Sequence, residues 1–495
     1  MLLTLGKDYF SSKNGGNALI QLDTAKLING HLFIVGSSGV GKSHTIRKLI
    51  AEGSLQGKKV RFHVFDVHGD LAIPGASVVL FSEQAPHGLN PLRVNPDPDF
   101  GGVRKCIQNF IRTINQASTT ALGVKQESVI RNLLLDVYRD FGFLQDDSST
   151  WGINAYQGRL VSGGADNRLY LDVSISDKDR AKALGARWDP EKRLWWIHTE
   201  KYQGAITEWK PVFKGRTYPT LADVTAYAKR LHEERFLGSD QKAVRALGYL
   251  NKTAQSYQRK LLDNAKQHRY EGIDAEASDE LNKAKERAIE AYSAYAVAVQ
   301  TGFELENLLK YDSADVLKSV LDRLNNLNAT GLFKDVPPPF DESVAVWRYK
   351  LDPLSTEEKK MLVFFMLQNI FANAVQRGEQ SDVVEVVVLD EMGVYSGSQD
   401  DEGGEGIIGV ISREARKFGL ALWAANQSTA NVPESLISSV ATKIILGLDE
   451  RYWKSAVDKL RIDTKLLDWV KPQSSIAVQM KEKGALKNRW WWVTL

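Results

Sequence analysis

The stretch "HLFIVGSSGVGKSHTIRKLIAEG" (residues 31–53) joins an apolar run to a glycine-rich turn and then to a helix-like segment. The run at 32–35 has the composition of a short buried strand. Ile46, Leu49 and Ile50 recur at the spacing that places side chains on one face of a helix. The stretch therefore predicts a strand, a loop and a helix in direct succession, the repeating unit of an α/β fold.

The loop between strand and helix has the chemistry for holding phosphate. Its glycines let backbone N–H groups converge on phosphate oxygens, and the following helix adds its positive N-terminal end. Lys42 can bridge the β- and γ-phosphates of ATP, and Ser43 can ligate Mg²⁺. The pattern arises by chance in roughly 2 of 100 chains of this length, so an ordinary glycine turn is the weaker interpretation. The expected nucleotide contacts are Gly36, Ser37, Ser38, Gly39, Val40, Gly41, Lys42, Ser43 and His44.

A second motif supplies the acids that such a loop requires. "VVEVVVLDEMG" (residues 383–393) is a nearly continuous β-branched run ending in Asp390 and Glu391, as expected for a buried parallel strand. Asp390 would hold Mg²⁺, and Glu391 would act as general base toward the attacking water. A buried strand that merely ends in acids is the alternative. Together with the glycine loop, the motif favours ATP hydrolysis.

Two further runs end in polar residues, as strands of the same sheet would. They are "KVRFHVFDVHGDL" (residues 59–71) and "LALWAANQS" (residues 420–428). Ligands of open α/β sheets bind at the carboxyl ends of the strands. Gln427 is therefore expected near the γ-phosphate or the attacking water. His68 is as compatible with a structural role as with a functional one.

The composition narrows the class of protein. The chain has 495 residues, 43% of them hydrophobic, which is ample for a large core with accessory modules. Its formal charge of +3 is not that of a strongly basic DNA-binding protein, so nucleic-acid contacts would come from local patches or from a ring of subunits. The single cysteine, Cys106, excludes a disulfide framework. Without an evident signal peptide or membrane span, a soluble cytoplasmic protein is expected.

Several motifs together resemble the HerA/FtsK superfamily of ring ATPases, especially HerA helicases and the ATPases of type IV secretion and conjugation. They are "FDVHGD", "LNPL", "VVVLDE" and "REARKFGLALWAANQS". The resemblance covers about residues 28–145 and 316–495. It implies a RecA-like P-loop ATPase core with a mainly parallel sheet, assembled as a homo-hexamer that moves double-stranded DNA through a pore. In the secretion branch, proteins are exported instead.

The same resemblance assigns roles to individual residues. Gly36, Gly41, Lys42 and Ser43 match the Walker A motif, and Asp390 and Glu391 match Walker B. Arg416 matches the arginine of the "RKFG" segment, which acts at the γ-phosphate, and Gln427 matches the polar sensor. A guanidinium fork would suit the charge that develops on the γ-phosphate oxygens. Arg413, Arg416 and Lys417 are spaced to share one helical face, so a solvated basic face is the alternative.

Two segments separate the halves of the core. A turn-rich linker leads to residues 168–209, where we expect a strand, a helix at 177–184, a turn, a strand and a short helix. This module resembles a small domain of plasmid primases. Its tryptophans beside Lys and Arg would suit nucleic-acid binding, although a tryptophan-rich core is the favoured interpretation. The expected parts are core 1–146, small α+β domain 147–216, return to the core 217–238, all-α insertion 239–330 and core 331–495.

Two functions of different class follow from these motifs. The first is an ATP-driven motor that translocates or unwinds double-stranded DNA for a plasmid, phage or defence system. The resemblance also implies a nuclease or mobilisation partner, although only about 30 residues precede the first core strand, where HerA proteins carry the barrel that docks their nuclease. The alternative is an assembly switch, or a type IV secretion-like ATPase, acting on a protein partner.

Overall fold

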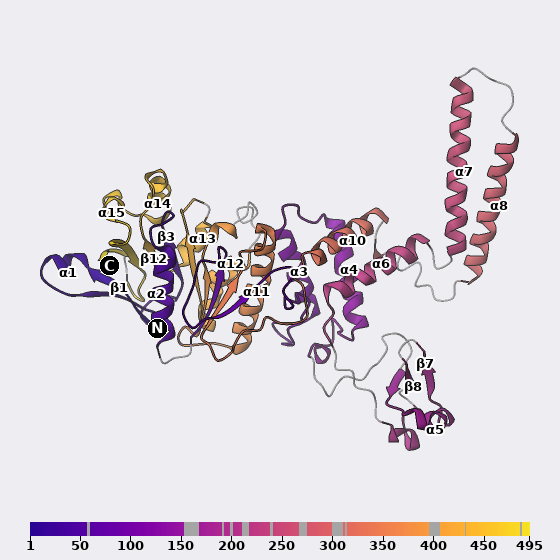
Figure 1. Ribbon diagram of the computed structural model, residues 1–495, viewed down its shortest axis with the longest axis horizontal. Helices are drawn as coiled ribbons and strands as arrows, with labels where there is room; N and C mark the ends of the chain where they lie inside the picture. Colours follow the sequence, from indigo (N-terminus) through magenta and orange to yellow (C-terminus); the bar gives the residue numbers. More distant parts are fainter. Residues whose placement is uncertain are drawn as a thin grey trace. The chain divides into compact units, whose positions relative to one another are not determined.

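The computed structural model divides into two compact units, each taken by itself below (Figure 1). The first comprises Met1–Ala121, Phe141–Thr220 and Asn328–Leu495, and the second Leu122–Asp140 and Leu221–Leu327. The residues that the structure describes are 1–56, 60–152, 168–190, 193–198, 201–209, 217–237, 241–266, 275–298, 310–311, 314–395, 406–430, 432–485 and 488–495.

An 11-stranded sheet forms the centre of the first unit. Seven neighbouring strands, in the order β12-β3-β11-β10-β4-β9-β5, pair in parallel, and β2-β1-β14-β13 extend the sheet with antiparallel pairs. The prediction of a mainly parallel sheet is confirmed. The strands are β1 (Leu2–Asp8), β2 (Leu19–Asp23), β3 (Leu32–Val35), β4 (Arg61–Asp66), β5 (Ser77–Leu80), β9 (Val346–Lys350), β10 (Glu385–Leu389), β11 (Leu420–Asn426), β12 (Thr442–Ile445), β13 (Ser475–Met480) and β14 (Arg489–Thr494).

Both faces of the central parallel strands β12, β3, β11, β10 and β4 are buried, which explains their nearly continuous apolar sequence, whereas the edge strand β5 exposes Val78 and Leu80. Alternate residues of β3, β10 and β11 share one core cluster with Ile46, Leu49 and Ile50 of α2, so the predicted apolar face of that helix is confirmed. The intervening residues, such as Phe33 and Val387, are equally buried on the other face. Outside the small inserted module, the helices of this unit are α1 (Tyr9–Lys13), α2 (Lys42–Ser54), α3 (Val103–Ala117), α11 (Thr356–Arg377), α12 (Ile407–Glu414), α13 (Glu434–Ser439), α14 (Trp453–Leu460) and α15 (Thr464–Trp469), with 3-10 turns η1 (Ser148–Thr150), η5 (Met392–Val394), η6 (Ala415–Phe418) and η7 (Glu450–Tyr452).

The strand register aligns the polar residues that follow the strands. Leu389, the last residue of β10, lies opposite Phe65 of β4 and Ala424 of β11. Asn426, the last residue of β11, lies opposite Val35, which precedes the glycine loop. The carboxyl ends of β3, β4, β10 and β11 therefore meet at one edge of the sheet.

The small inserted module folds around a separate three-stranded sheet in the order β6-β8-β7. The predicted strands and first helix are present, but β7 was not predicted, and the final helix is a 3-10 turn. Trp196 and Trp209 are buried, whereas Trp188 is 49% exposed, so the tryptophan-rich core does not include every tryptophan. The elements are β6 (Arg168–Leu171), η2 (Ile175–Asp177), α5 (Lys178–Ala183), β7 (Arg187–Asp189), β8 (Leu194–His198) and η4 (Gly204–Glu208). Most of the expected linker, residues 153–167, lies outside the described residues.

The second unit is all-α, as predicted for the insertion, and also contains residues assigned to the core from sequence. Helix α6, expected in the returning core, packs against α4, and α7 packs along α8. Buried Asp136 of α4 accepts a hydrogen bond from Tyr311 and pairs with Lys310, contacts between distant residues that local pattern cannot reveal. No described helix has the length and apolarity to span a membrane. The helices are α4 (Val124–Asp140), α6 (Leu221–Leu237), α7 (Gln241–Lys266), α8 (Ala275–Ala298) and α10 (Ala314–Ala329).

Candidate nucleotide-binding site

The glycine loop connects β3 to α2 in the conformation that phosphate binding needs. Gly39 and Gly41 have φ angles of 81° and 104°, where a side chain would be strained. The Lys42 ammonium donates hydrogen bonds to the carbonyl oxygens of Gly36 (2.7 Å) and Ser37 (3.1 Å). The lysine is therefore folded over the loop, where its charge faces the space above the backbone N–H groups.

Close packing fixes the start of the loop. A Cβ on Gly36 would lie 2.6 Å from Cγ2 of Val40, so only glycine fits there. The Gly36 N–H donates to the Asn426 carbonyl (3.2 Å), and the Ser37 N–H donates to the Gly447 carbonyl (2.9 Å). The two strands on either side of β3 thus hold the loop in place.

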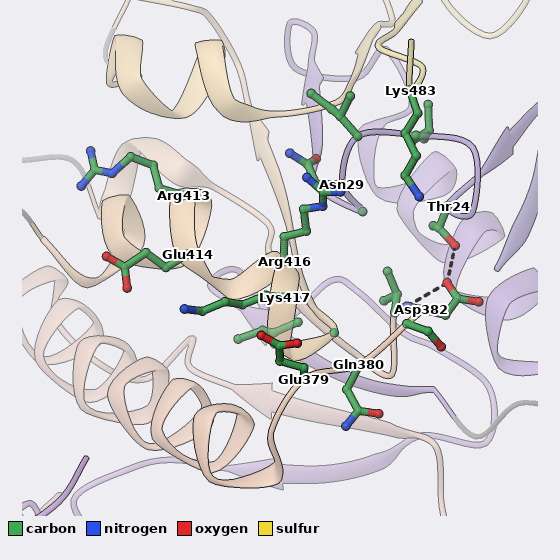
Figure 2. A pocket seen from close by; sticks show the side chains of 17 residues that line it. Thr24, Asn29, Glu379, Gln380, Asp382, Arg413, Glu414, Arg416, Lys417 and Lys483 are labelled. Atoms are coloured by element: carbon green, nitrogen blue, oxygen red, sulfur yellow. Dashed lines mark hydrogen bonds between the residues drawn. The ribbon is translucent and has the colours of Figure 1, made fainter. Parts of the chain in front are cut away.

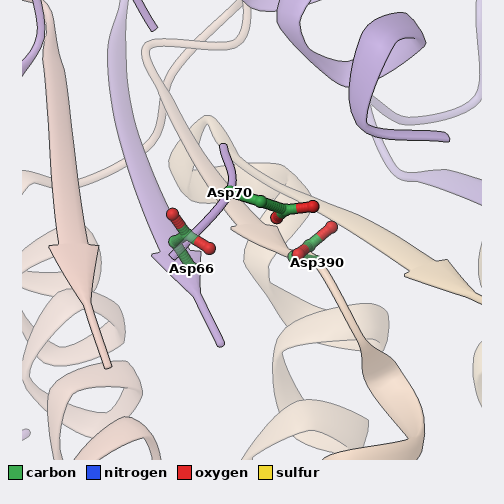
Figure 3. Close-up of side chains that lie close together, drawn as sticks. All are labelled: Asp66, Asp70 and Asp390. Carbon is green, nitrogen blue, oxygen red and sulfur yellow. The ribbon is translucent and has the colours of Figure 1, made fainter. Parts of the chain in front are cut away.

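Three carboxylates gather at the ends of β4 and β10 (Figure 3), and the charges of two of them, Asp70 and Asp390, act on Lys42. Asp66, Asp70 and Asp390 each offer an oxygen within 4.8 Å of the others. Burial raises the pKa of Asp390 to about 7, with the charges of Asp70, Asp66 and Glu391 adding to the rise and Lys42 opposing it. Such repulsion is relieved by a divalent cation, and oxygen donors suit Mg²⁺. The residues present therefore fit Mg²⁺.

Asp66 and Asp70 have different roles in this cluster. Buried Asp66 accepts hydrogen bonds from the N–H groups of Gly69 (2.7 Å) and Leu71 (3.1 Å). It also pairs with Arg348 of β9, whose Nε and Nη2 lie 2.8 and 2.5 Å from its Oδ2. Asp66 therefore shapes the turn. Asp70 is exposed, and no hydrogen bond or ion pair engages it within the described ranges, so its carboxylate is free to ligate.

Glu391 and Gln427 meet at the ends of neighbouring strands. The Gln427 Nε2 donates to Glu391 Oε2 at 3.2 Å; Gln427 is exposed and Glu391 is half-buried. Buried Asn426 accepts from the Gly393 N–H (3.0 Å) through its side chain while its carbonyl holds Gly36. Asn426 thus links the glycine loop to the turn after β10.

Arg413, Arg416 and Lys417 lie at the other edge of the sheet. Arg413 belongs to α12, which ends at Glu414, whereas Arg416 and Lys417 belong to the 3-10 turn η6 before β11. The predicted single helical face is therefore interrupted. Because Gln427 follows the far end of this seven-residue strand, Arg416 is roughly 20 Å from the phosphate loop of its own chain.

The basic residues line a pocket of about 520 Å³ (Figure 2). Asn29, Asp382 and Lys483 contribute to its walls, and Thr24 donates a hydrogen bond to Asp382 (2.9 Å). The pocket lies at the amino ends of β10 and β11.

Most sequence-predicted site residues do come together. Lys42, Asp390, Glu391 and Gln427 occupy one edge with the loop residues 36–44, whereas Arg416 does not join them. His68 is exposed, and no metal-ligand group within the described ranges includes it. Other contributors received no individual role from the sequence: the contacts of Arg348 and Asn426 depend on distant partners, whereas Asp66 and Asp70 belong to a polar strand end that was expected at the ligand edge.

Comparisons with known proteins agree with this geometry. Residues 11–98 match the family profile described as "Helicase HerA, central domain", and residues 168–211 match DUF5710, a domain of unknown function. Among solved structures, VirB4 of Thermoanaerobacter pseudethanolicus is similar with a TM-score of 0.53 and 14% identity, over 98% of this chain and 96% of that one. The plasmid coupling protein TrwB in complex with ADP and Mg²⁺ gives a TM-score of 0.42 and 11% identity, over 94% and 85%. The search of curated proteins found no match.

The likeness to VirB4 supports the fold described above, and the HerA profile covers the strand, glycine loop and helix that hold Lys42. The acids expected of a Walker B strand stand beside that loop. The chain therefore has the fold of a P-loop ATPase, and its residues 11–98 are similar to the central domain of the HerA helicase.

Proposed function

We propose that this ATPase is a ring-forming motor that moves double-stranded DNA. The observation that carries the catalytic part of the proposal is the convergence of Lys42, Asp390, Glu391 and Gln427 at one sheet edge. Lys42 and the loop N–H groups bind the phosphates, while Ser43 and Asp390, with Asp70 beside them, would hold Mg²⁺. That ion supplies charge neutralisation at the β- and γ-phosphates.

Glu391 is the general base of the proposed reaction. Its half-buried carboxylate lies at the end of β10, and the hydrogen bond from Gln427 orients it. An oriented carboxylate takes a proton from water as the water attacks the γ-phosphorus. Gln427 also lies where its amide can respond to the presence of the γ-phosphate.

Arg416 completes the site of a neighbouring subunit in this proposal. It lies at the sheet edge opposite its own phosphate loop, in a solvent-open pocket whose lining includes both basic and acidic side chains. A guanidinium supplied in trans stabilises the charge of phosphoryl transfer, and head-to-tail contacts of this kind close into rings. A homo-hexamer is the assembly that the HerA/FtsK type favours. Mass photometry with an ATP analogue should show a species near six times the subunit mass.

DNA is the proposed cargo because residues 11–98 match the central domain of a helicase and because the sequence of the inserted module resembles a domain of plasmid primases. The decisive experiment measures ATPase activity with and without duplex DNA across a salt series. DNA should raise turnover, and its binding should weaken steeply with salt because phosphate contacts release counterions. If DNA neither binds at low salt nor changes turnover, the motor proposal fails. A response to a protein partner alone would favour the switch or secretion alternative.

A further inference from the structure

A second cavity, of about 560 Å³, adjoins the glycine loop on the side away from the acids. Val40, Leu446 and Ile476 give it apolar walls, and His44 and Gln473 are among its polar lining residues. An apolar pocket with a few polar groups is the usual setting of a small-molecule site. Because it opens beside Gly41, a nucleotide whose phosphates lie on the loop can place its base there.

Gln473 reaches this cavity from a strained backbone position. Its φ angle is 60°, in the left-handed region that favours glycine. The turn around it is tightly bonded: the N–H groups of Ser474 and Ser475 both donate to the Lys471 carbonyl, at 3.1 and 3.0 Å. Backbone strain at a ligand cavity points to a side chain retained for function.

The side chain of Gln473 faces the loop and has a free amide. Its Cγ lies 4.0 Å from where a Cβ on Gly41 would stand. The residue is exposed, and none of the hydrogen bonds found among the described residues involves its amide. A glutamine amide presents a donor and an acceptor side by side, which matches the adjacent N6 donor and N7 acceptor of adenine, whereas guanine presents two acceptors there.

We propose that Gln473 is a specificity-determining residue that reads the base of the bound nucleotide and selects ATP over GTP. This rests on the proposed nucleotide site but not on the motor function. Glycine relieves the left-handed strain and removes the amide. Gln473→Gly should therefore lose base recognition without losing stability of the fold. Gln473→Glu keeps the shape but loses the donor.

The test measures the Kd of ATP, GTP and inorganic tripolyphosphate by calorimetry on the full chain with Mg²⁺. Loss of the amide should raise the Kd of ATP about tenfold in both variants. The Kd of GTP and of tripolyphosphate should stay unchanged, so the preference for ATP disappears. Arg461→Gly is the matched control, because Arg461 is also left-handed (φ 52°) but does not line the cavity; it should leave all three affinities unchanged.

The outcomes distinguish this inference from the nucleotide site itself. If tripolyphosphate and ATP both fail to bind the unaltered protein, the nucleotide site is wrong and the inference falls with it. If they bind but ATP and GTP bind equally well, or Gln473→Gly keeps the ATP preference, Gln473 does not read the base. A melting temperature of Gln473→Gly at or above that of the unaltered protein confirms that the affinity change is not due to unfolding.

Discussion

At the scale of single residues, the phosphate-binding role of Lys42 is the most direct to test. Burial lowers its pKa, whereas the negative charges of Glu391, Asp390 and Asp70 oppose that change by stabilising the ammonium. Lys42→Ala removes a charge-assisted contact to phosphate and should weaken ATP binding by roughly 10- to 100-fold. Calorimetry checks this, with Lys465→Ala, an exposed lysine of α15, as the control expected to bind normally. Unchanged affinity in Lys42→Ala would remove the phosphate role.

Glu391→Gln separates binding from hydrolysis. The amide cannot take a proton from water, so turnover should fall by about 10²- to 10⁴-fold. ATP affinity should be kept, because Lys42 and the loop remain. Rapid-quench kinetics and ATP binding on the same preparation measure both quantities. Normal turnover in this variant would show that another group is the base.

Burial of His31 should make the free energy of unfolding depend on pH. It is buried directly before β3, its Nδ1 accepts from the Leu422 N–H (2.9 Å), and burial lowers its pKa from 6.5 to about 4. Between these values the unfolded chain binds more protons than the folded one, so folding weakens as pH falls. The loss should approach roughly 3 kcal/mol by pH 4. Urea unfolding from pH 4 to 7 should show a shallower dependence in His31→Gln; identical profiles would contradict the assignment.

At the scale of elements, the pair between Asp66 and Arg348 joins the turn after β4 to strand β9. Arg348→Met leaves the Asp66 charge buried without its partner and should lower the free energy of unfolding by about 3–5 kcal/mol. The turn carrying Asp70 should loosen as well, so the Mg²⁺ dependence of ATP binding should shift to higher Mg²⁺. Arg377→Met, which removes a more exposed partner of Glu385, is the comparison and should lower the free energy of unfolding by less. Equal losses of unfolding free energy in the two variants would show that the buried pair of Asp66 and Arg348 contributes no more than the exposed one.

How far the sequence predicts these elements depends on how local their causes are. The strand, loop and helix around Lys42 arise from residues within 25 positions of one another, and the capping box that begins α11 at Ser355 is equally local. Asp390 and Gln427 were predictable because each directly follows an apolar strand. Arg348 was not, because its partner lies 282 positions away in sequence. Nor was the left-handed Gln473, since nothing in its neighbours demands that backbone.

At the scale of the whole molecule, the sheet separates two parts of one proposed reaction. The carboxyl ends of β3, β4, β10 and β11 carry the phosphate loop and the acids, whereas Arg416 lies before the amino end of β11. A strand of seven residues between them is too long for any side-chain movement to span. If Arg416 serves hydrolysis, a single chain is incomplete and its partner is another copy of itself.

Mixing inactive subunits tests that conclusion. Lys42→Ala and Arg416→Ala should each abolish turnover alone, the first by losing the phosphates and the second by losing the trans guanidinium. In an equal mixture, about a quarter of the interfaces of a closed ring pair an intact loop with an intact Arg416, so roughly that share of the original activity should return. Pairing Lys42→Ala with Glu391→Gln is the control: both defects lie in the same half-site, so no interface is repaired. Recovery only in the first mixture places Arg416 in a neighbour's site, and no recovery in either would leave Arg416 without a role in trans.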